Sequence, residues 1–145
     1  MERGLYLACV IHFKKFYDLS FKEQAKRYEL QMIDIHILLF LKNNPSLNTA
    51  RDIVACRGLS KSNVSNALEK LRRRGLMRLE EDSENRRIQR IFLMPEGEAM
   101  ALSLRETQTG CFERMLEGFS REERDEMDRS FRRIEANVTA ALREL

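Results

Sequence analysis

Residues 59–76, LSKSNVSNALEKLRRRGL, decide the fold of this chain. Ser60 is a preferred residue type at the start of a helix, and Gly75 is typical of the position just after a helix ends. Between them, apolar residues recur at the i, i+3, i+4, i+7 spacing of one helix face. They are Val64, Ala67, Leu68 and Leu71. The stretch therefore predicts a helix over residues 60–74 that buries one stripe of side chains.

The opposite face of this predicted helix is polar and mostly small or cationic. A helix that enters the major groove of DNA needs such a face, because Asn, Ser, Lys and Arg contact base edges and phosphates whereas bulky apolar groups cannot. The candidate contacts are Ser60, Lys61, Ser62, Asn63, Ser65, Asn66, Lys70 and Arg73. The alternative interpretation is an ordinary solvated face.

A shorter helix is predicted directly before it. Thr49 and Asp52 have the spacing of a capping box, and Gly58 supplies the left-handed residue that commonly ends a helix. These signals predict a helix from Ala50 to about Arg57. Two helices joined at a glycine are typical of a helix-turn-helix.

A β-hairpin is predicted next, with strands at residues 76–80 and 88–94 and a polar loop between them. Basic side chains at its tip are suited to a phosphate or a narrow minor groove. The candidate wing contacts are Asn85, Arg86 and Arg87. A charged tip is also common on ordinary protein surfaces. The order of two helices and a hairpin predicts a winged helix-turn-helix.

The N-terminal part predicts two helices. Residues 5–28 read as one long helix with an irregularity near residue 19, where Ser20 and Glu23 resemble a capping box. Residues 32–43 are almost solidly apolar, which predicts a central helix that ends before Pro45.

The C-terminal part also predicts two helices. Pro95 fits the first position of a helix that continues to about Glu117. Gly118 ends it, and Ser120 with Glu123 forms a capping box for the last helix. In that helix the apolar residues are alternately four and three positions apart: Met127, Phe131, Ile134, Val138, Ala141 and Leu145. This narrow seam predicts contact with another helix, in the same subunit or in a second copy.

The composition fits one globular domain of 145 residues, with 43% hydrophobic and 34% charged residues. The apolar runs are too short to span a membrane, and the first residues lack the pattern of a secretory signal. Three widely spaced cysteines favour a reducing compartment, so a cytoplasmic protein is expected. Residues 48–94 carry a net positive charge and residues 95–145 a net negative charge. The basic stretch suits a localised anion-binding surface, and the alternative is an ordinary solvated charged face.

Catalysis and metal binding are not predicted. The chain has no nucleophile elbow, Gly-rich phosphate loop or metal-binding helix motif. Its two histidines are His12 and His36, and Cys9 with His12 supplies at most half of a metal site. We therefore predict a protein that is not an enzyme and that uses no cofactor and no metal.

Residues 30–97 resemble the MarR family of bacterial and archaeal transcriptional regulators. Residues 59–65, LSKSNVS, look like the start of the family's recognition helix, and residues 71–76, LRRRGL, look like its end. The third match is to the wing signature, Asp-x-Arg followed by Leu-Thr-x-x-Gly. It comprises Asn85, Arg86 and Arg87, with Leu93 and Gly97 at the family's spacing.

The resemblance implies one domain over residues 1–145 that is mainly α with a small β-hairpin wing. It implies a helical dimerisation region at about 1–30 and 98–145, and a winged helix-turn-helix at about 31–97. Family members are homodimers that bind palindromic operators in double-stranded DNA. In them the residue matching Arg87 reaches into a minor groove, and the preceding Asp steadies it. The implied function is a transcriptional regulator, most simply a repressor.

Three residues depart from the family pattern. Asn85 stands where the family has Asp, so an orienting ion pair becomes at best a neutral hydrogen bond. Met94 replaces a Thr that caps the following helix, a contact commonly worth about 1 kcal/mol. Asn66 replaces a base-contacting Arg of many members, and Asn favours adenine where Arg favours guanine.

The resemblance also assigns the terminal helices to a dimer, for which the candidate interface residues are Leu5, Met127, Phe131, Ile134, Val138 and Leu142. MarR-like proteins commonly bind a small aromatic or anionic effector, and some sense peroxide through a Cys in the first helix. Candidates for such a pocket or redox site are Cys9, His12 and Tyr17, near Tyr6 and Phe13. The plainer interpretation of these side chains is core packing, and a lone Cys on an apolar helix face is most often inert.

The rival interpretation of the whole chain is a protein–protein adaptor that uses a winged helix as a docking surface without direct DNA binding. The two differ in their response to salt, because only DNA binding loses affinity steeply as salt rises.

Overall fold

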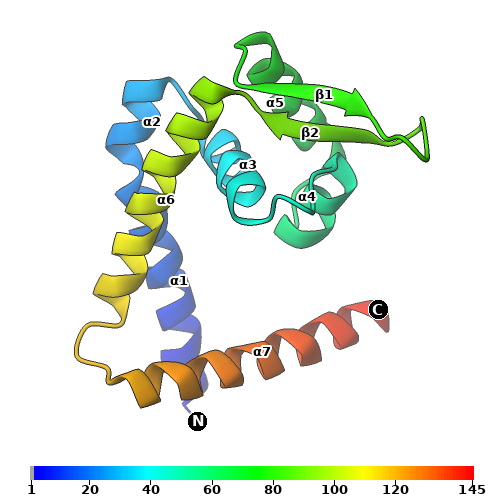
Figure 1. The fold of residues 1–145 in the computed structure, drawn as a ribbon. Helices are drawn as coiled ribbons and strands as arrows, with labels where there is room; N and C mark the ends of the chain where they lie inside the picture. Colours follow the sequence, from blue (N-terminus) through cyan, green and yellow to red (C-terminus); the bar gives the residue numbers. More distant parts are fainter. Residues whose placement is uncertain (1) are drawn as a thin grey trace. The chain divides into compact units, whose positions relative to one another are not determined.

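The computed structural model describes residues 2–145, which form a largely helical chain with one β-hairpin (Figure 1). The elements in order are α1 (Arg3–Ser20), α2 (Lys22–Tyr28), α3 (Met32–Asn43), α4 (Ala50–Arg57), α5 (Lys61–Arg73), β1 (Met77–Glu81), β2 (Gln89–Leu93), α6 (Pro95–Met115) and α7 (Arg121–Arg143). The chain divides into two compact units, the first ending at Cys111 and the second comprising Phe112–Leu145. The fold class expected from the sequence is confirmed.

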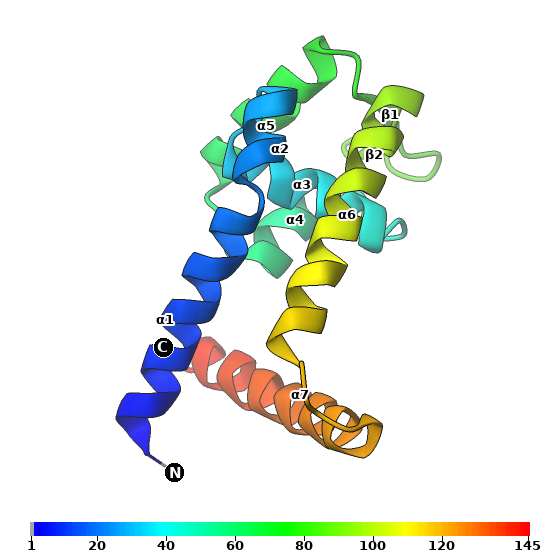
Figure 2. The same ribbon diagram turned by 90° about the vertical axis from the view of Figure 1, so that its left-hand side faces the viewer.

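The core of the first unit is built around α3, as its solidly apolar sequence predicts. Side chains from Ile37 to Leu41 are all buried. Helix α5 contributes the expected stripe of buried residues, and Ile53 of α4 and Ile91 of β2 close the core. Figure 2 shows α3 behind and between α1–α2 on one side and α6 on the other. None of the helices within residues 2–145 is both long and apolar enough to cross a membrane.

The two strands pair antiparallel, with Leu79 opposite Ile91. Each of the four strand ends lies one residue from its predicted position, because β1 is Met77–Glu81 rather than 76–80 and β2 is Gln89–Leu93 rather than 88–94. The loop between them projects from the sheet (Figure 1). The hairpin therefore has the form of a wing beside the helix-turn-helix.

Two of the three capping boxes that the sequence suggests are formed. Thr49 and Asp52 make a reciprocal capping box at the start of α4, and Ser120 and Glu123 make one at the start of α7. Gly58 ends α4 in the left-handed conformation, with φ of 61°. These contacts satisfy backbone groups that a helix end otherwise leaves unpaired.

The irregularity predicted near residue 19 is a complete break, so the N-terminal segment forms two helices rather than one. It breaks at Phe21, between α1 and α2, and the expected Ser20–Glu23 capping box does not form. Instead the Ser20 hydroxyl donates to the carbonyl of Phe16 at 2.7 Å. Back-bonding of this kind bends helices, and here it sets the break where the fully buried Phe21 ring enters the core.

Helix α6 begins against the backbone that leads into the wing. The amide of Met94 donates to the carbonyl of Leu76 at 2.9 Å. A Cβ atom on Gly97 would lie only 2.0 Å from that same carbonyl oxygen. The first turn of α6 can therefore approach Leu76 only because residue 97 has no side chain.

Candidate nucleic-acid interface

Helix α5 separates a buried stripe from an exposed polar face. Its apolar residues are buried, and Ser60 begins it by accepting a hydrogen bond from the amide of Asn63 at 3.2 Å. Lys70 is half-buried. The other candidate contacts predicted on this face are exposed: Ser60, Lys61, Ser62, Asn63, Ser65, Asn66 and Arg73. All of these except Arg73 therefore lie at or within the N-terminal two turns of α5.

Two surface hollows flank this face of α5. One is lined by residues that include Gln31, Asn63 and Lys70. The other is lined by residues that include Ser65 of α5 and Gln89 of the wing. Asn66 lines both hollows. Asn66 therefore lies on the part of α5 that separates the two hollows.

The C-terminal cations of α5 are held within the protein. Lys70 Nζ lies 2.5 Å from Oδ2 of Asp34, whose side chain is fully buried. The guanidinium of Arg74 donates to the backbone carbonyls of Tyr28 and Glu29, at 2.7 and 3.0 Å. These contacts fix the C-terminal end of α5 to the end of α2 and the first turn of α3. Sequence reasoning missed them because their partners are distant in the chain.

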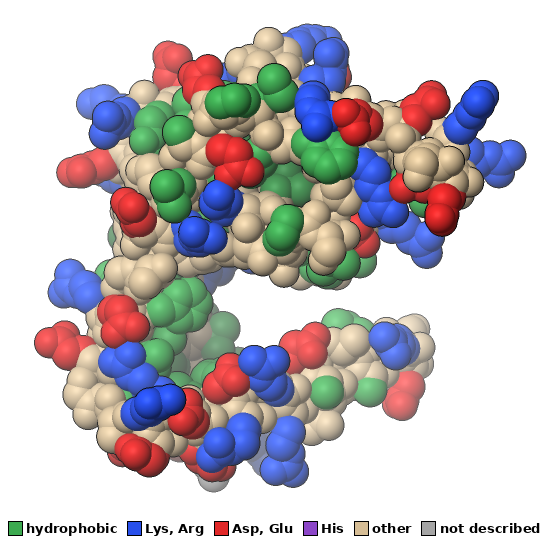
Figure 3. Space-filling view, in the orientation of Figure 1, with side chains coloured by type: hydrophobic (Ala, Val, Ile, Leu, Met, Phe, Trp, Pro, Cys, Tyr) green, Lys and Arg blue, Asp and Glu red, His purple; other side chains and the backbone are tan. Residues whose placement is uncertain are grey.

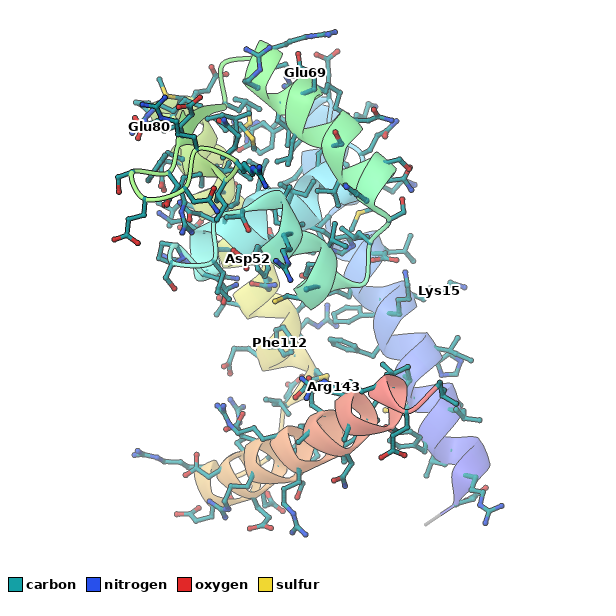
Figure 4. All side chains as sticks on the ribbon, turned by 90° about the vertical axis from the view of Figure 1, so that its right-hand side faces the viewer. Lys15, Asp52, Glu69, Glu80, Phe112 and Arg143 are labelled. Carbon is teal, nitrogen blue, oxygen red and sulfur yellow. The ribbon has the colours of Figure 1, made fainter. Side chains whose placement is uncertain are left out.

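Glu69 holds two further arginines. Its carboxylate accepts two hydrogen bonds from Arg72, at 2.7 and 3.0 Å, and one from Arg73 at 3.0 Å. Hydrogen bonds from Arg72, reinforced by Arg73, lower the pKa of Glu69 to about 2. Glu69 lies on the outer side of α5 in Figure 4, so the charge there is a compact ionised cluster rather than a row of separate cations.

The wing tip carries the other candidate cations. Arg86 and Arg87 are exposed, and among residues 2–145 neither they nor Lys61 has a carboxylate within ion-pair distance. Asn85 is exposed, and its Oδ1 accepts a hydrogen bond from the amide of Arg87 at 3.1 Å. The neutral hydrogen bond expected at Asn85 is thus made to the backbone. Figure 3 shows blue side chains at the outer end of the hairpin, with acidic ones beside them.

A network of hydrogen bonds at the start of the wing loop was not predicted. Asp82 Oδ1 accepts from Nε of Arg90 at 3.0 Å, and Arg90 Nη1 donates to Oδ1 of Asn48 at 3.1 Å. The Arg90 hydrogen bond, supported by the amide of Glu84, lowers the pKa of Asp82. The residue type of Asp82 could have indicated a turn, since Asp is a common first residue of turns. Its partners Arg90 and Asn48 could not be predicted from their positions in the sequence.

The candidate effector and redox residues do not form one site. Cys9 and His12 are exposed on α1, whereas Tyr17 is buried, with its ring stacked on His36 at 6.3 Å between centroids. Gln108 Nε2 donates to the Tyr17 hydroxyl at 2.8 Å. Desolvation raises the pKa of Tyr17.

His36 and Arg57 extend this cluster. Arg57 Nη2 lies 2.6 Å from Nδ1 of His36. Burial, followed by the charge of Arg57, lowers the pKa of His36. The neutral ring therefore offers Nδ1 as an acceptor. Across residues 2–145, no group of three or more His, Cys, Asp or Glu side chains is placed to bind a metal ion.

The second unit exposes the seam predicted on its last helix. Helix α7 has no fully buried side chain. Met127 is half-buried, and exposed apolar side chains follow it along α7: Phe131, Ile134, Val138 and Leu142. Leu5, the candidate interface residue on α1, is also exposed. The predicted seam therefore lies on an exposed face of α7.

A helix-turn-helix with a hairpin wing, a polar recognition face and exposed arginines at the wing tip defines a winged helix-turn-helix protein. Residues 28–88 match the sequence model of the MarR family. This match confirms the resemblance that the sequence itself indicated. No curated protein sequence matches the chain significantly.

Solved structures of MarR-family regulators have the same fold. A regulator from Silicibacter pomeroyi is 22% identical with a TM-score of 0.79, covering 94% of this chain and 90% of that one. A Listeria monocytogenes regulator complexed with 26mer DNA is 17% identical with a TM-score of 0.82, covering 97% and 92%. The Staphylococcus aureus MepR–DNA complex is 17% identical with a TM-score of 0.73, covering 95% and 96%. The family model and these structures describe transcriptional regulators, not enzymes.

Proposed function

We propose that this protein binds double-stranded DNA as a homodimer and represses transcription from a palindromic operator. The observation that carries the proposal is the solvent-facing polar side of α5, with Lys61 at its start and the exposed Arg86 and Arg87 on the neighbouring wing. The free amides at the N-terminus of α5 and the Lys61 ammonium suit a phosphate. Such a role requires the protein to be in the cytoplasm with the DNA.

Base recognition is proposed for the amides of α5. Asn63 and Asn66 are exposed and one helical turn apart, and a carboxamide pairs best with the N6 and N7 atoms of adenine. We therefore expect adenine at the operator steps that face these residues. The contact set proposed for α5 also includes Lys61 and the smaller hydroxyl side chains Ser60, Ser62 and Ser65.

The dimer is proposed to form through the terminal helices, with Phe131 on α7 as its test. This side chain is 54% exposed, and on an interface it would be buried. Phe131→Glu should give monomers or aggregates by light scattering, whereas Arg133→Glu, another charge-changing substitution on α7, should stay dimeric. A well-folded dimeric Phe131→Glu protein would reject this seam as the interface. In the dimer, two copies of α5 would enter successive major grooves about 34–36 Å apart.

The DNA-binding proposal is tested by salt. The logarithm of DNA affinity should fall linearly with the logarithm of salt, with a slope of several units per dimer. Arg87→Ala should reduce that slope by about 2 per dimer if each Arg87 meets a phosphate, or remove A·T preference if it enters a minor groove. Arg105→Ala, an exposed arginine on α6, is the control. Absence of salt-dependent binding to any duplex would favour the adaptor.

We further propose that a small aromatic or anionic effector adjusts DNA affinity through Tyr17, His36 and Arg57. A guanidinium beside stacked rings offers the two contacts that an aromatic carboxylate needs. Benzoate should raise the melting temperature of the wild-type protein and not that of Arg57→Ala. The oxidative alternative places the response at the exposed Cys9, so Cys9→Ser would abolish any effect of peroxide on DNA binding.

A further inference from the structure

One carboxylate organises the loop of the wing. Asp82 Oδ2 accepts from the amides of Glu84 and Asn85, both at 3.1 Å, while Oδ1 accepts from Nε of Arg90 at 3.0 Å. Only 18% of the Asp82 side chain is exposed. The side-chain oxygen thus takes the place of a backbone acceptor in a tight turn.

Arg90 carries this anchorage into the body of the first unit. Its Nη1 donates to Oδ1 of Asn48, which is 7% exposed. Asn48 is bound to β2 twice, because its Nδ2 donates to the carbonyl of Ile91 at 3.2 Å and its own carbonyl accepts from the Ile91 amide at 2.8 Å. The network from Asp82 therefore ends on a buried amide that cannot shift without disturbing the strand.

The same loop sets the place of Arg86 and Arg87. The amide of Asp82 donates to the carbonyl of Ile88 at 2.9 Å, and the amide of Ile88 donates to the carbonyl of Asn85 at 3.0 Å. Both arginines lie between these closed points. Asp82 stabilises the conformation of this loop, and that conformation determines the direction in which the side chains of Arg86 and Arg87 project.

We propose that Asp82 and Arg90 are positioning residues of the wing, which hold Arg86 and Arg87 ready for DNA without touching it. A loop that is already ordered loses less conformational entropy on binding, and this increases affinity. Asn85 has no charge with which to steady the wing, and the carboxylate of Asp82 supplies charge-assisted hydrogen bonds in its place. The inference rests on the proposed function for its DNA readout.

The decisive variant is Asp82→Asn, with Glu84→Gln as its matched control. Both remove one negative charge from the same loop, but the exposed Glu84 contributes only its backbone amide to the turn. Loss of negative charge near DNA by itself favours binding. We expect Glu84→Gln to bind as well as or better than wild type, and Asp82→Asn to bind about fivefold more weakly.

A double-mutant cycle shows whether Asp82 acts through the arginines. In a protein that carries Arg86→Ala and Arg87→Ala, adding Asp82→Asn should change affinity less than twofold or so, because the positioned groups are gone. The salt slope of Asp82→Asn alone should stay that of wild type. The proposal is overturned if Asp82→Asn binds as tightly as Glu84→Gln, or if its loss is unchanged in the arginine-free background.

Trypsin supplies a readout without DNA, since it cleaves after Arg86 and Arg87 when the loop opens. Asp82→Asn, and equally Arg90→Gln, should be cut at these sites several times faster than Glu84→Gln, with other sites unaffected. Equal cleavage rates would overturn the positioning role even if DNA binding is confirmed. If the wild-type protein binds no DNA, the proposed function fails, and faster cleavage of Asp82→Asn would still establish that Asp82 holds the loop.

Discussion

Replacing Lys70 by Met tests whether this residue anchors α5 rather than contacting DNA. Asp34 is fully buried, and its Oδ2 accepts from Lys70 Nζ at 2.5 Å and from the amide of Gln31 at 2.8 Å. Within the described chain, Oδ1 of Asp34 has no hydrogen-bond partner. Met retains the apolar stem of Lys70, so the substitution removes the charge with little loss of packing.

The expected effect follows from what remains around the carboxylate. Removing one partner of a buried ion pair commonly costs about 3–5 kcal/mol, because the other charge stays buried and unpaired. The Lys70 side chain is 41% exposed, so water can replace part of its contact and the lower end applies. We expect the free energy of unfolding to fall by about 3 kcal/mol. Asp34→Asn added to Lys70→Met should restore much of it, since an amide is cheaper to bury than a charge.

The assay is urea unfolding followed by circular dichroism at one chain concentration, because the stability of a dimer depends on concentration. Lys61→Met is the matched control, since Lys61 is exposed, and it should change stability by less than about 0.5 kcal/mol. Equal stability of the two variants would refute the anchoring role. If Lys70→Met instead lowered the salt slope of DNA binding at unchanged stability, Lys70 would be a phosphate contact.

Two further predictions concern stability. Gly97→Ala should cost at least about 2 kcal/mol in thermal unfolding, because its Cβ would meet the backbone of Leu76, while Gly110→Ala, with open space around it, should be neutral or stabilising; equal effects would refute the close approach. Burial and the charge of a neighbouring guanidinium lower the pKa of His36 from its usual 6.5, so the unfolded chain takes up the proton more readily. As far as His36 is concerned, the free energy of unfolding should therefore be highest above about pH 6.5 and should fall as the pH drops below this value and through the folded-state pKa. His36→Gln should reduce this dependence of stability on pH, whereas substitution of the exposed His12 should not.

Helix boundaries could be predicted from sequence wherever the stabilising partner is only a few residues away. The capping boxes at Thr49 and Ser120 depend on a side chain three positions later, and both form. An irregularity near residue 19 could be predicted, but not the contact that produces the break at Phe21, because the same Ser20 that resembles a cap can also donate backward to Phe16. The choice between the two depends on where the Phe21 ring is buried, which is a property of the tertiary structure.

The polar face of α5 could likewise be predicted, because helical periodicity alone determines which side chains share a face. It could not be predicted which of its cationic side chains are bound within the protein and which are free to contact DNA. Lys70 binds Asp34, 36 residues earlier, and Arg74 binds the carbonyls of Tyr28 and Glu29. Lys70 and Arg74 therefore attach the C-terminal end of α5 to the start of α3 and the end of α2, whereas Arg72 and Arg73 bind Glu69.

The number of cations that are not paired within the protein sets the salt dependence expected for the proposed complex with DNA. In α5 and the wing loop, the described cations without a carboxylate partner are Lys61, Arg86 and Arg87. If each meets one phosphate in both subunits, the log–log salt slope is about 5 per dimer. A much steeper measured slope would require Arg72 and Arg73 to leave Glu69, and Glu69→Gln would then raise affinity at low salt. A slope near 5 that Glu69→Gln leaves unchanged would mean that the ionised cluster stays closed on DNA, and that Glu69 serves to keep two arginines away from the phosphates.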